Sequence, residues 1–498
     1  MGIRSVLSKP LAAIIAKDQR KWSLDPGAYQ KKIFDQIVAK ASPTIFGQDH
    51  GFSDIHSYED YKKQVPIRDY EGLSPYVNKI LDGDSDVLWP GKPAYFAKTS
   101  GTTSGTKYIP LTKESIPNHI NSARNALLSY IHESGNGRFL DGKLIFLSGS
   151  PVLTQSASVH TGRLSGIVNH HVPQYLRTNQ MPSYDTNCME DWEEKVDQIV
   201  EETYNQDMSL ISGIPPWVQM YFDKLVEKMN KPIKDLFPNF SMFVYGGVNF
   251  EPYRAKLFET IGKEIPSIET YPASEGFIAY QDSQYAEGLL LLANSGIFFE
   301  FVPTDEYFNE NPTRLSIDEA EIGVNYAVII NSNAGLWGYS IGDTVKFVSK
   351  DPHRLLVTGR IKHFISAFGE HVIGEEVEKA MKFTCEKFPE TELVEFTVAP
   401  NVTPESGLPR HEWFISFANE PQDLEAFRNE LNSQLQKQNT YYDDLITGSV
   451  LTHLKIIKLQ PDAFIEYMKS IGKLGGQNKV PRLSNDRKIA DELMQYKI

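Results

Sequence analysis

A run of nine residues, numbers 99–107, has the clearest chemical content in the chain, with the sequence TSGTTSGTK. Six of its side chains carry hydroxyls, two residues are glycines and the last is a lysine. Glycines let backbone N–H groups approach a phosphate, short hydroxyls donate further hydrogen bonds, and a lysine neutralises charge. Because each donor to a charged group contributes about 1.5–3 kcal/mol, several together can hold a triphosphate. The composition of this run therefore predicts a polyphosphate-binding loop.

This run differs from the Walker A phosphate loop, which requires Gly-Lys followed by Ser or Thr. Here Lys107 is preceded by Thr106 and followed by Tyr108. A flexible surface linker is the alternative, since Gly, Ser and Thr tracts are common in linkers. The flanking residues 95–97 and 108–111 are largely apolar, which favours a loop held between two strands.

Two shorter motifs each contain a carboxylate beside a predicted strand. Glu275, in the sequence YPASEG at 271–276, could hold Mg²⁺ on ATP, because hard cations prefer oxygen ligands. The alternative is a helix capped by Ser274, with Glu275 in its first turn. Asp343 ends the sequence YSIGD at 339–343 and suits the two hydroxyls of a ribose, although Gly-Asp is also an ordinary turn.

Short apolar runs typical of buried strands alternate with helical patterns around these motifs. We expect strands at 143–150, 208–213, 241–247 and 267–271, with helices at 189–204 and 216–229. This alternation predicts an α/β fold with mostly parallel sheets. Ligands of such sheets bind beyond the carboxyl ends of the strands, where several of the unusual loops fall.

The pattern of the chain changes near residue 360. A strand at 354–358 leads into a polar crossing at 359–363, and a mixed pattern of helices and strands follows. That pattern predicts an α+β region of about 130 residues, which is large enough for its own core. We therefore expect a large N-terminal α/β domain at 1–361 and a small, mobile C-terminal α+β domain at 362–498.

Composition excludes several classes of protein. Fifty Lys+Arg against 64 Asp+Glu give 50 − 64 = −14, so sequence-independent binding to DNA or anionic lipid is disfavoured. The apolar run 11–16 is too short for an exported leader, and no stretch approaches the roughly 20 apolar residues of a membrane span. Only Cys188 and Cys385 occur, so we expect no disulfide framework. These features indicate a cytoplasmic protein that binds neither nucleic acid nor membrane, and we expect a monomer.

The order and spacing of the motifs resemble the adenylate-forming superfamily. Two later segments, GRIK at 359–362 and NKVPR at 478–482, complete the resemblance. Within the superfamily, the chain is similar to the Gretchen Hagen family of acyl-acid amido synthetases, known from plants as auxin- and jasmonate-conjugating enzymes and also present in bacteria. The run 99–107 matches that family's Ser-Ser-Gly-Thr phosphate loop, and 479–482 matches its Lys-Val-Pro-Arg stretch.

The two tyrosine motifs match the family with departures. Pro272 and Ala273 depart from the family's Tyr-Ala-Ser-Ser-Glu, and Ser340 and Ile341 depart from its Tyr-Arg-Val-Gly-Asp. The resemblance runs from about Trp22 to the last residues, and the length near 500 is that of a bacterial-type member.

The resemblance implies a two-step ligase reaction with ATP and Mg²⁺. A carboxylic acid would attack the α-phosphorus of ATP to give an acyl-adenylate and pyrophosphate. An amine, typically an amino acid, would then attack the acyl carbon and expel AMP. One alternative passes the acyl group to coenzyme A, and another is a catalytically silent nucleotide-binding module. The intact Lys107, Glu275, Asp343, Lys362 and Lys479 argue against the silent module.

The resemblance also assigns roles to individual residues. Lys107, Lys362, Lys479 and Glu275 would be catalytic, with Glu275 also assisting Mg²⁺, Lys362 at the hinge, and Lys479 reaching the N-terminal domain to steady negative charge. The nucleotide would be bound by Ser100, Gly101, Thr102, Thr103, Ser104, Gly105, Gly246, Gly247, Val248, Tyr271, Ser274, Tyr339, Asp343 and Arg360. Among these, Gly246, Gly247 and Val248 would line the adenine slot, and Asp343 would accept the ribose hydroxyls.

The acyl pocket is indicated only by two arginines. Arg124, on a predicted helix at 120–134, and Arg163 could each pair with a substrate carboxylate, because a guanidinium binds a carboxylate bidentately. The alternative for each is a surface or structural arginine. His170 and His171 do not predict a metal site, since adjacent residues on a strand point to opposite faces and no third ligand is spaced nearby.

Overall fold

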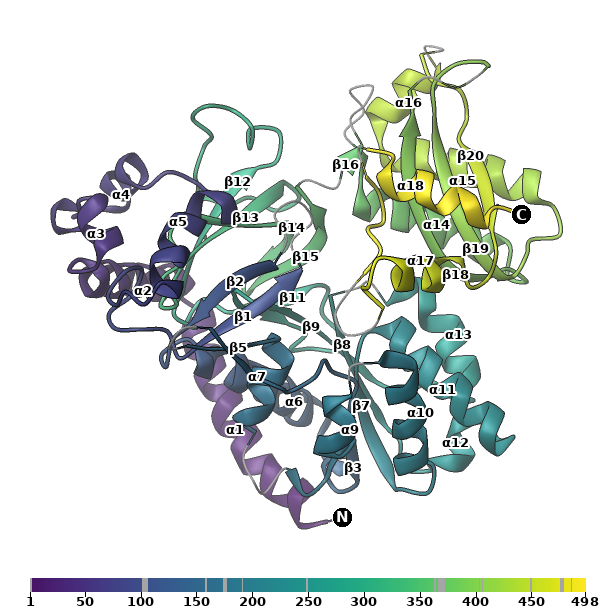
Figure 1. The fold of residues 1–498 in the computed structure, drawn as a ribbon, viewed down its shortest axis with the longest axis horizontal. Helices are drawn as coiled ribbons and strands as arrows, with labels where there is room; N and C mark the ends of the chain where they lie inside the picture. The colour runs from purple at the N-terminus through teal and green to yellow at the C-terminus, as the bar shows by residue number, and fades with distance from the viewer. Residues whose placement is uncertain are drawn as a thin grey trace. The chain divides into compact units, whose positions relative to one another are not determined.

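The computed structural model describes residues 2–100, 106–156, 159–172, 177–189, 191–247, 250–361, 364–365, 372–402, 404, 406–447, 450–474, 479–484 and 486–498, with only the backbone at 100, 106, 156, 216, 252, 364–365, 440, 441 and 444. The chain forms two compact units, drawn in Figure 1: Met1–Val248 with Thr260–Leu356, and Asn249–Glu259 with Val357–Ile498. The division falls at 356/357, and Asn249–Glu259, placed in the N-terminal domain by sequence, belongs to the second unit. The sequence-based boundary at 361/362 stays a prediction.

Helices form the beginning of the first unit. They are α1 (Ile3–Ser23), α2 (Pro26–Ala41), α3 (Ile45–Asp49), the 3-10 helix η1 (Phe52–Asp54), α4 (Tyr58–Gln64) and α5 (Tyr70–Leu81). Asp25, Ser57 and Asp69 begin α2, α4 and α5, because each side chain accepts a hydrogen bond from a first-turn amide.

Eleven strands of the described chain form one mixed sheet in the order β12-β13-β14-β15-β11-β10-β9-β8-β7-β3-β6. Their bounds are β3 (Lys143–Phe146), β6 (Gln180–Met181), β7 (Met208–Ser212), β8 (Met242–Gly246), β9 (Ser267–Ala273), β10 (Gly276–Tyr280), β11 (Leu289–Leu291), β12 (Ile297–Pro303), β13 (Asn325–Ser332), β14 (Tyr339–Lys350) and β15 (His353–Arg360). The five strands β6, β3, β7, β8 and β9 are parallel, which confirms the predicted α/β pattern of 143–271.

The expectation of mostly parallel sheets holds for only this half of the large sheet. The β9–β10, β10–β11, β11–β15, β12–β13 and β13–β14 pairs are antiparallel. Short hairpin connections explain the difference at β9–β10 and β13–β14, because antiparallel neighbours need only a tight turn whereas parallel neighbours need a crossover.

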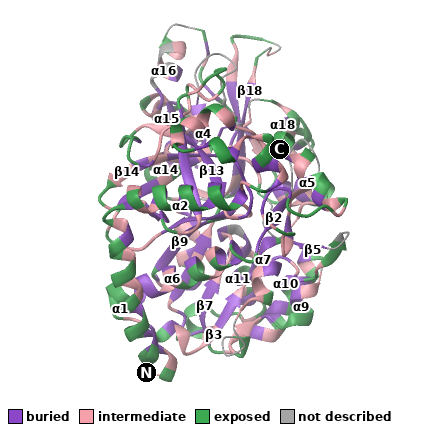
Figure 2. Cartoon of the chain, turned by 90° about the vertical axis from the view of Figure 1, so that its left-hand side faces the viewer, coloured by how far each residue is buried: buried purple, intermediate pink, exposed green. Residues whose placement is uncertain are grey.

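A smaller sheet has the order β2-β1-β5-β4. Its strands are β1 (Tyr95–Ser100), β2 (Thr106–Leu111), β4 (Thr154–Ser156) and β5 (Val159–Gly162). The remaining helices of this unit are α6 (Ile116–Ser134), η2 (Arg138–Leu140), α7 (Leu164–His170), α9 (Tyr184–Cys188), α10 (Trp192–Thr203), α11 (Pro215–Met229) and α12 (Ile233–Leu236). In Figure 2 the strands of the large sheet are mostly buried, whereas α1 and α2 carry exposed residues on their outer faces.

The second unit is an α+β domain around the sheet β18-β19-β20, as the sequence pattern predicts. Its elements are α13 (Glu251–Ile261, of which residues 251–259 belong here), β16 (Phe364–Ile365), β17 (Val372–Ile373), α14 (Gly374–Lys387), β18 (Glu392–Asn401), β19 (Arg410–Asn419), α15 (Leu424–Gln438), α16 (Thr440–Thr447), β20 (Lys455–Leu459), α17 (Ala463–Ser470), α18 (Lys488–Leu493) and η3 (Met494–Tyr496). The stacked rings of Phe396 and Trp413 lie at the centre of its core.

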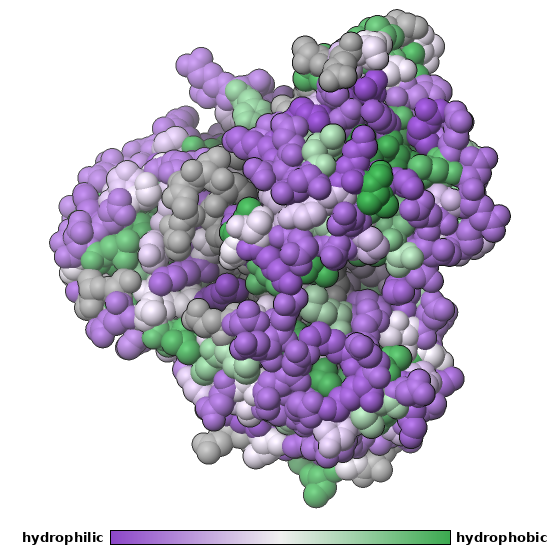
Figure 3. All heavy atoms as spheres, turned by 45° about the vertical axis from the view of Figure 1, so that its right-hand side comes forward, coloured by the Kyte–Doolittle hydropathy of each residue, from purple (hydrophilic) through white to green (hydrophobic). Residues whose placement is uncertain are grey.

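Hydrophilic residues dominate the face of the molecule in Figure 3, and hydrophobic residues occur there in small separate groups. Among the helices of the described ranges, none has the length and apolarity that crossing a membrane requires.

Candidate active site

The predicted phosphate loop is flanked by a β-hairpin. β1 and β2 pair antiparallel through the last described positions on either side of the loop, Ser100 and Thr106. Residues 101–105 lie outside the described residues, but their flanks are strands, as the sequence predicts. Lys107 stands opposite Thr99 in this hairpin, is half-buried, and holds its Nζ 5.7 Å from the centre of the Tyr70 ring.

The predicted ribose residue is held by a tyrosine of the other motif. The Tyr271 hydroxyl at the end of β9 donates to Asp343 Oδ2 at 2.7 Å, and both side chains are buried. Asp343 lies in a bulge of β14, where residues 341–343 oppose the single residue Val328 of β13. Gly342 provides the bulge with φ of +80°, a conformation that glycine adopts without strain. The Gly-Asp pair is therefore a bulge within a strand, and the turn considered from the sequence is wrong.

Glu275 lies in a tight turn between two strands. Ser274 and Glu275 connect β9 to β10, so the helix cap considered as an alternative is wrong. The Tyr339 hydroxyl, almost fully buried, lies 3.5 Å from Glu275 Oε1. Burial, and then the negative charge of Glu275, raise the pKa of Tyr339 well above its usual value, so its hydroxyl stays protonated and can donate. Each motif tyrosine thus lies beside the carboxylate of the opposite motif.

The predicted adenine slot lies next to the same tyrosine. Gly246 at the end of β8 pairs with Thr270, the residue before Tyr271. A Cβ at Gly246 would lie 2.4 Å from the Thr270 carbonyl oxygen, so only glycine fits at this position. Gly247 has φ of +75°, and Val248 lies outside the described residues. The structure therefore places Gly246, Tyr271 and Asp343 in one neighbourhood at the carboxyl ends of β8 and β9.

Two residues near this site were missed by the sequence analysis. Tyr70, the first residue of α5, accepts a hydrogen bond from the Tyr108 amide at 2.9 Å and contributes to the raised pKa of Tyr339. Asn118 on α6 bonds both the amide and the carbonyl of Phe277, two residues after Glu275. Neither residue belongs to a motif, and only the tertiary fold brings them to the site.

The two predicted substrate arginines differ in position. Arg163 directly follows β5, whose Gly162 pairs with Ala97 of β1, so it lies beside the strand that enters the predicted phosphate loop. Its Cδ would lie 2.6 Å from a Cβ placed on Gly149. Arg124 is exposed on α6 and donates to the Asn125 side chain, as expected for a surface arginine. Arg163 therefore stays a candidate near the site, whereas the structure gives Arg124 no such neighbourhood.

A buried lysine near Arg163 was also missed. Lys195 of α10 donates from Nζ to the carbonyl oxygens of Ser148 and Asn187, at 2.9 and 2.8 Å. Burial, and then the positive charge of Arg163, lower its pKa to about 8. Ser148 lies in the loop after β3, at the carboxyl end of the parallel strands, so Lys195 fixes one wall of that region.

The remaining predicted residues lie in the second unit or outside the described residues. Arg360 and Lys479 are exposed side chains of the second unit. Lys362 lies outside the described residues.

The described residues of the site could hold Mg²⁺ only together with the phosphates of a bound nucleotide. The described residues contain no group of three or more His, Cys, Asp and Glu side chains that could hold a metal. Mg²⁺ is usually bound by one or two carboxylates together with substrate phosphates and waters. The half-buried carboxylate of Glu275 is a donor of this kind.

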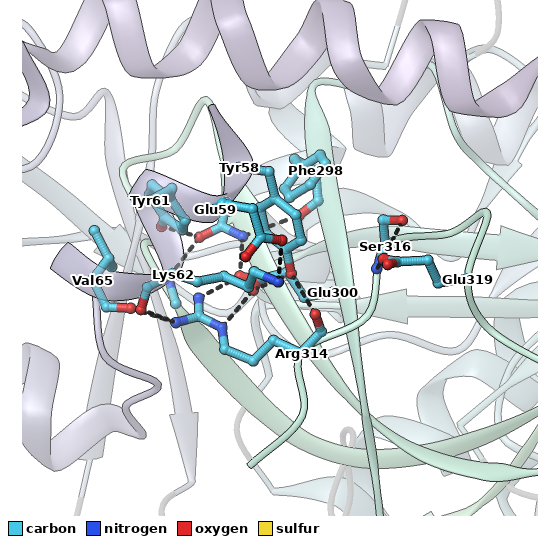
Figure 4. Close-up of polar contacts among 12 residues, drawn as sticks. Tyr58, Glu59, Tyr61, Lys62, Val65, Phe298, Glu300, Arg314, Ser316 and Glu319 are labelled. Carbon is cyan, nitrogen blue, oxygen red and sulfur yellow. Dashed lines mark hydrogen bonds and ion pairs between the residues drawn. The ribbon is translucent and has the colours of Figure 1, made fainter. Parts of the chain in front are cut away.

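A buried ion pair fixes the N-terminal helices to the large sheet behind the site (Figure 4). Arg314 donates from Nε and Nη2 to the two carboxylate oxygens of Glu300 on β12, at 2.7 and 2.9 Å. Its Nη1 donates to the carbonyl of Val65, just after α4, at 2.5 Å. Tyr58 of α4 and Asn331 of β13 also donate to Glu300, at 2.8 and 2.7 Å. Every carboxylate oxygen is therefore paired, which a buried charge requires.

Three family models match successive parts of this chain. The GH3 family N-terminal domain matches residues 16–149, the GH3 family central domain matches 290–360, and the GH3 family C-terminal domain matches 375–488. The first match includes the hairpin of Lys107, the second includes Asp343, and the third includes Lys479.

Curated relatives and solved structures agree with these matches. The chain is 23% identical over 457 residues to jasmonoyl–L-amino acid synthetase JAR4 of Nicotiana attenuata, covering 77% of this chain and 78% of that protein. It is 22% identical over 396 residues to indole-3-acetic acid-amido synthetase GH3.3 of Arabidopsis thaliana, covering 64% of each. Its fold matches AtGH3.15 acyl acid amido synthetase in complex with 2,4-DB, with a TM-score of 0.79, 16% identity, and coverage of 98% and 96%. It also matches 2-hydroxyisobutyryl-CoA ligase in complex with 2-HIB-AMP, with a TM-score of 0.63, 14% identity, and coverage of 96% and 92%.

Proposed function

Because this chain belongs to the GH3 family, we propose that it is an acyl-acid amido synthetase, an ATP-dependent ligase that joins a carboxylic acid to an amino acid. The observation that carries the proposal is the crossed pairing of the two motifs, in which Tyr271 binds Asp343 and Tyr339 lies beside Glu275. This pairing joins residues expected at a ribose and at a phosphate-bound cation, and sets them beside Gly246.

The reaction has two steps at one centre. A carboxylate oxygen of the acid forms a bond to the α-phosphorus of ATP while the bond to pyrophosphate breaks. The amine nitrogen then attacks the acyl carbon, loses a proton and expels AMP, leaving an amide. The first step brings an anion to an anionic phosphate, so positioned cations and hydrogen-bond donors are its main requirement.

The residues of the first unit meet this requirement in the following way. Lys107 and the run 99–106 neutralise and orient the triphosphate. Asp343, oriented by the Tyr271 hydroxyl, accepts the ribose hydroxyls. Gly246 lets the end of β8 lie close against β9, since a Cβ there would meet the Thr270 carbonyl, and the adenine binds at this strand end. Glu275 would carry Mg²⁺, which supplies further neutralisation of the phosphates.

The cellular setting is proposed from composition. The net charge of −14 and the two free cysteines support a cytoplasmic protein that uses small molecules and binds neither nucleic acid nor membrane, and we propose that it is a monomer. The likeness to a coenzyme A ligase concerns the fold alone, so thioester formation is an outcome of the test below.

An activation assay tests the first step. The protein is incubated with ATP, Mg²⁺, hydroxylamine and a panel of aryl and aliphatic acids. We expect a hydroxamate with at least one acid, because hydroxylamine captures an activated acyl group. Absence of hydroxamate across a broad panel would favour a silent nucleotide-binding module.

A second assay identifies the acceptor. Amino acids or coenzyme A replace hydroxylamine, and the products are identified by mass. An amide of an amino acid supports the proposal, whereas a thioester without an amide would assign the chain to the ligases that use coenzyme A. Lys107→Ala is the matched inactive variant, which should lose adenylation and keep its melting temperature without ATP.

A further inference from the structure

Arg482, the last residue of the Lys-Val-Pro-Arg stretch, is buried in the second unit among several acceptors. Its Nε donates to Glu378 at 3.1 Å, and its Nη1 donates to Glu395 and to the carbonyl of Phe396. Its Nη2 donates to the Tyr253 hydroxyl at 2.6 Å. Only 11% of the side chain is exposed, so this is one of the most completely bonded arginines of the described chain.

The backbone around Arg482 is fixed to the same sheet. The Arg482 carbonyl accepts from the Val398 amide of β18 at 2.9 Å, and the Val398 carbonyl accepts from the Ser484 amide at 2.9 Å. The Thr397 hydroxyl donates to the Pro481 carbonyl at 2.7 Å. Residues 481–484 therefore follow the edge of β18 like a short parallel strand.

We call Arg482, together with residues 481–484 that follow β18, the anchor. Lys479 lies three residues before Arg482. At roughly 3.3 Å per extended residue, its Cα lies within about 10 Å of that of Arg482. Its side chain is exposed, as a lysine that must reach a reacting group requires. Together with the Thr397–Pro481 bond, the bonds of Arg482 hold the chain shortly beyond Lys479.

The anchor also contacts the helix that follows the proposed adenine slot. Tyr253 lies in the first turn of α13, shortly after Gly247, and its hydroxyl donates to Glu395 at 2.9 Å while it accepts from Arg482. The guanidinium lies 4.7 Å from the centre of the Phe396 ring. Burial alone would lower the pKa of Arg482. The nearby Glu395, Tyr253 and Glu378 instead raise this pKa well above its usual value, so the side chain stays charged.

We propose that Arg482 is a positioning residue for Lys479: its bonds to Glu378, Glu395 and Tyr253 fix the segment from which that lysine reaches the α-phosphate. This inference rests on the proposed function, in which Lys479 steadies negative charge during adenylation. A guanidinium suits the role because its planar fork binds several acceptors at fixed angles, which a lysine cannot do.

A double-mutant cycle tests the inference. Lys479→Ala, Arg482→Ala and the double variant are compared in ATP–pyrophosphate exchange at saturating ATP. Lys479→Ala should lose roughly 10²–10³-fold, the usual loss for one preorganised donor. If Arg482 acts through Lys479, Arg482→Ala should lose at least tenfold, and the double variant should be no slower than Lys479→Ala. The ATP dissociation constant should change less than twofold in all three.

Two further variants keep the inference testable if Arg482→Ala does not fold. Tyr253→Phe keeps the ring and removes one acceptor, and we expect a threefold to tenfold slower exchange without a change in ATP affinity. Arg487→Ala is the matched control, because Arg487 also binds carboxylates and a carbonyl of this unit, at Glu412, Asp491 and Pro400. It should leave the exchange rate within twofold.

Each contrary result has a separate meaning. The positioning role is wrong if the losses of exchange rate in the two single variants multiply in the double variant. It is also wrong if Arg487→Ala and Tyr253→Phe lose the same exchange rate. Either result would indicate a purely structural arginine. Unchanged exchange in Lys479→Ala would overturn the role of Lys479 and the inference with it. Absence of any adenylation by the unaltered chain would instead overturn the proposed function.

Discussion

At the level of single residues, neighbouring tyrosine hydroxyls orient the carboxylates of the site. Asp343 is buried and receives the Tyr271 hydroxyl at 2.7 Å, which fixes one of its oxygens. A bound ribose would be accepted by this same carboxylate. Hydrogen bonds to charged groups contribute about 1.5–3 kcal/mol each, so losing the carboxylate costs more than losing the hydroxyl that orients it.

We therefore expect Asp343→Ala to raise the KM for ATP by roughly 10- to 100-fold. Tyr271→Phe should raise it only about threefold to tenfold, because the carboxylate remains but is less well oriented. Tyr307→Phe is the matched control, since the Tyr307 hydroxyl donates to Ser340 at 2.9 Å, three residues from Asp343. Steady-state kinetics with varied ATP provide the measurement, and an equal change in the control would contradict the assignment.

Lys195 makes a pH-dependent contribution to stability. Its Nζ has two carbonyl acceptors, which the neutral amine's two N–H groups can satisfy. Its pKa is about 8 in the fold and about 10.5 when unfolded, so between these values the unfolded chain binds more protons. The free energy of unfolding should therefore rise with pH across this window. At pH values below the window, the folded chain carries the full free-energy cost of burying the charged Lys195 amine.

Comparison with Lys195→Met isolates this effect, because all other titrating groups are shared. Between pH 7.5 and pH 10 we expect the unaltered chain to gain about 2 kcal/mol relative to the variant. Urea unfolding at several pH values measures the difference. Two parallel curves would mean that Lys195 has an ordinary pKa in the fold.

A site residue could be predicted from the sequence only where its neighbours along the chain form a recognisable motif. Lys107, Glu275 and Asp343 belong to motifs, so residue types within a few positions were sufficient to select them. Tyr70 and Lys195 could not be found in this way, because each reaches its neighbours only through the packing of a distant helix. Arg124 was selected by residue type alone; it is exposed, and its role in binding substrate stays a prediction.

At the level of elements, close backbone approach determines where the site can form. β8 and β9 run so near each other that Gly246 has no space for a side chain, and the bulge of β14 turns Asp343 toward Tyr271. The parallel strands β3, β7, β8 and β9 were predictable because each is a short apolar run. The bulge was not, since the same residues YSIGD also suit a turn.

The buried Arg314–Glu300 pair offers a test of how the N-terminal helices are held. Arg314→Met removes the partner of a carboxylate that is 0% exposed, and breaking such a pair usually costs about 3–5 kcal/mol. We expect a strongly lowered melting temperature. Lys31→Met is the control, because Lys31 and Asp35 form an exposed pair on α2 whose loss should cost less than about 1 kcal/mol. Similar melting temperatures for both variants would contradict the structural role.

At the level of the whole molecule, the chain is divided in a way that sequence order conceals. The segment Asn249–Glu259 lies in the second unit although the chain before and after it belongs to the first. Tyr253 and Lys256 explain this, because they bind Arg482 and Glu392 of that unit. A sequence read in order cannot reveal such a segment, since its partners lie more than 100 residues away.

Two lysines, Lys362 at the expected hinge and Lys479 beyond it, suggest that the second unit rotates between adenylation and amide formation. Lys362→Pro removes the amine and also restricts the backbone, whereas Lys362→Ala removes the amine alone. If rotation about this position is required, Lys362→Pro should slow one half-reaction at least tenfold more than the other, relative to Lys362→Ala. Pyrophosphate exchange measures the first half-reaction, and amide release from a supplied acyl-adenylate measures the second. Equal losses in both half-reactions would mean that one arrangement of the two units serves the whole reaction.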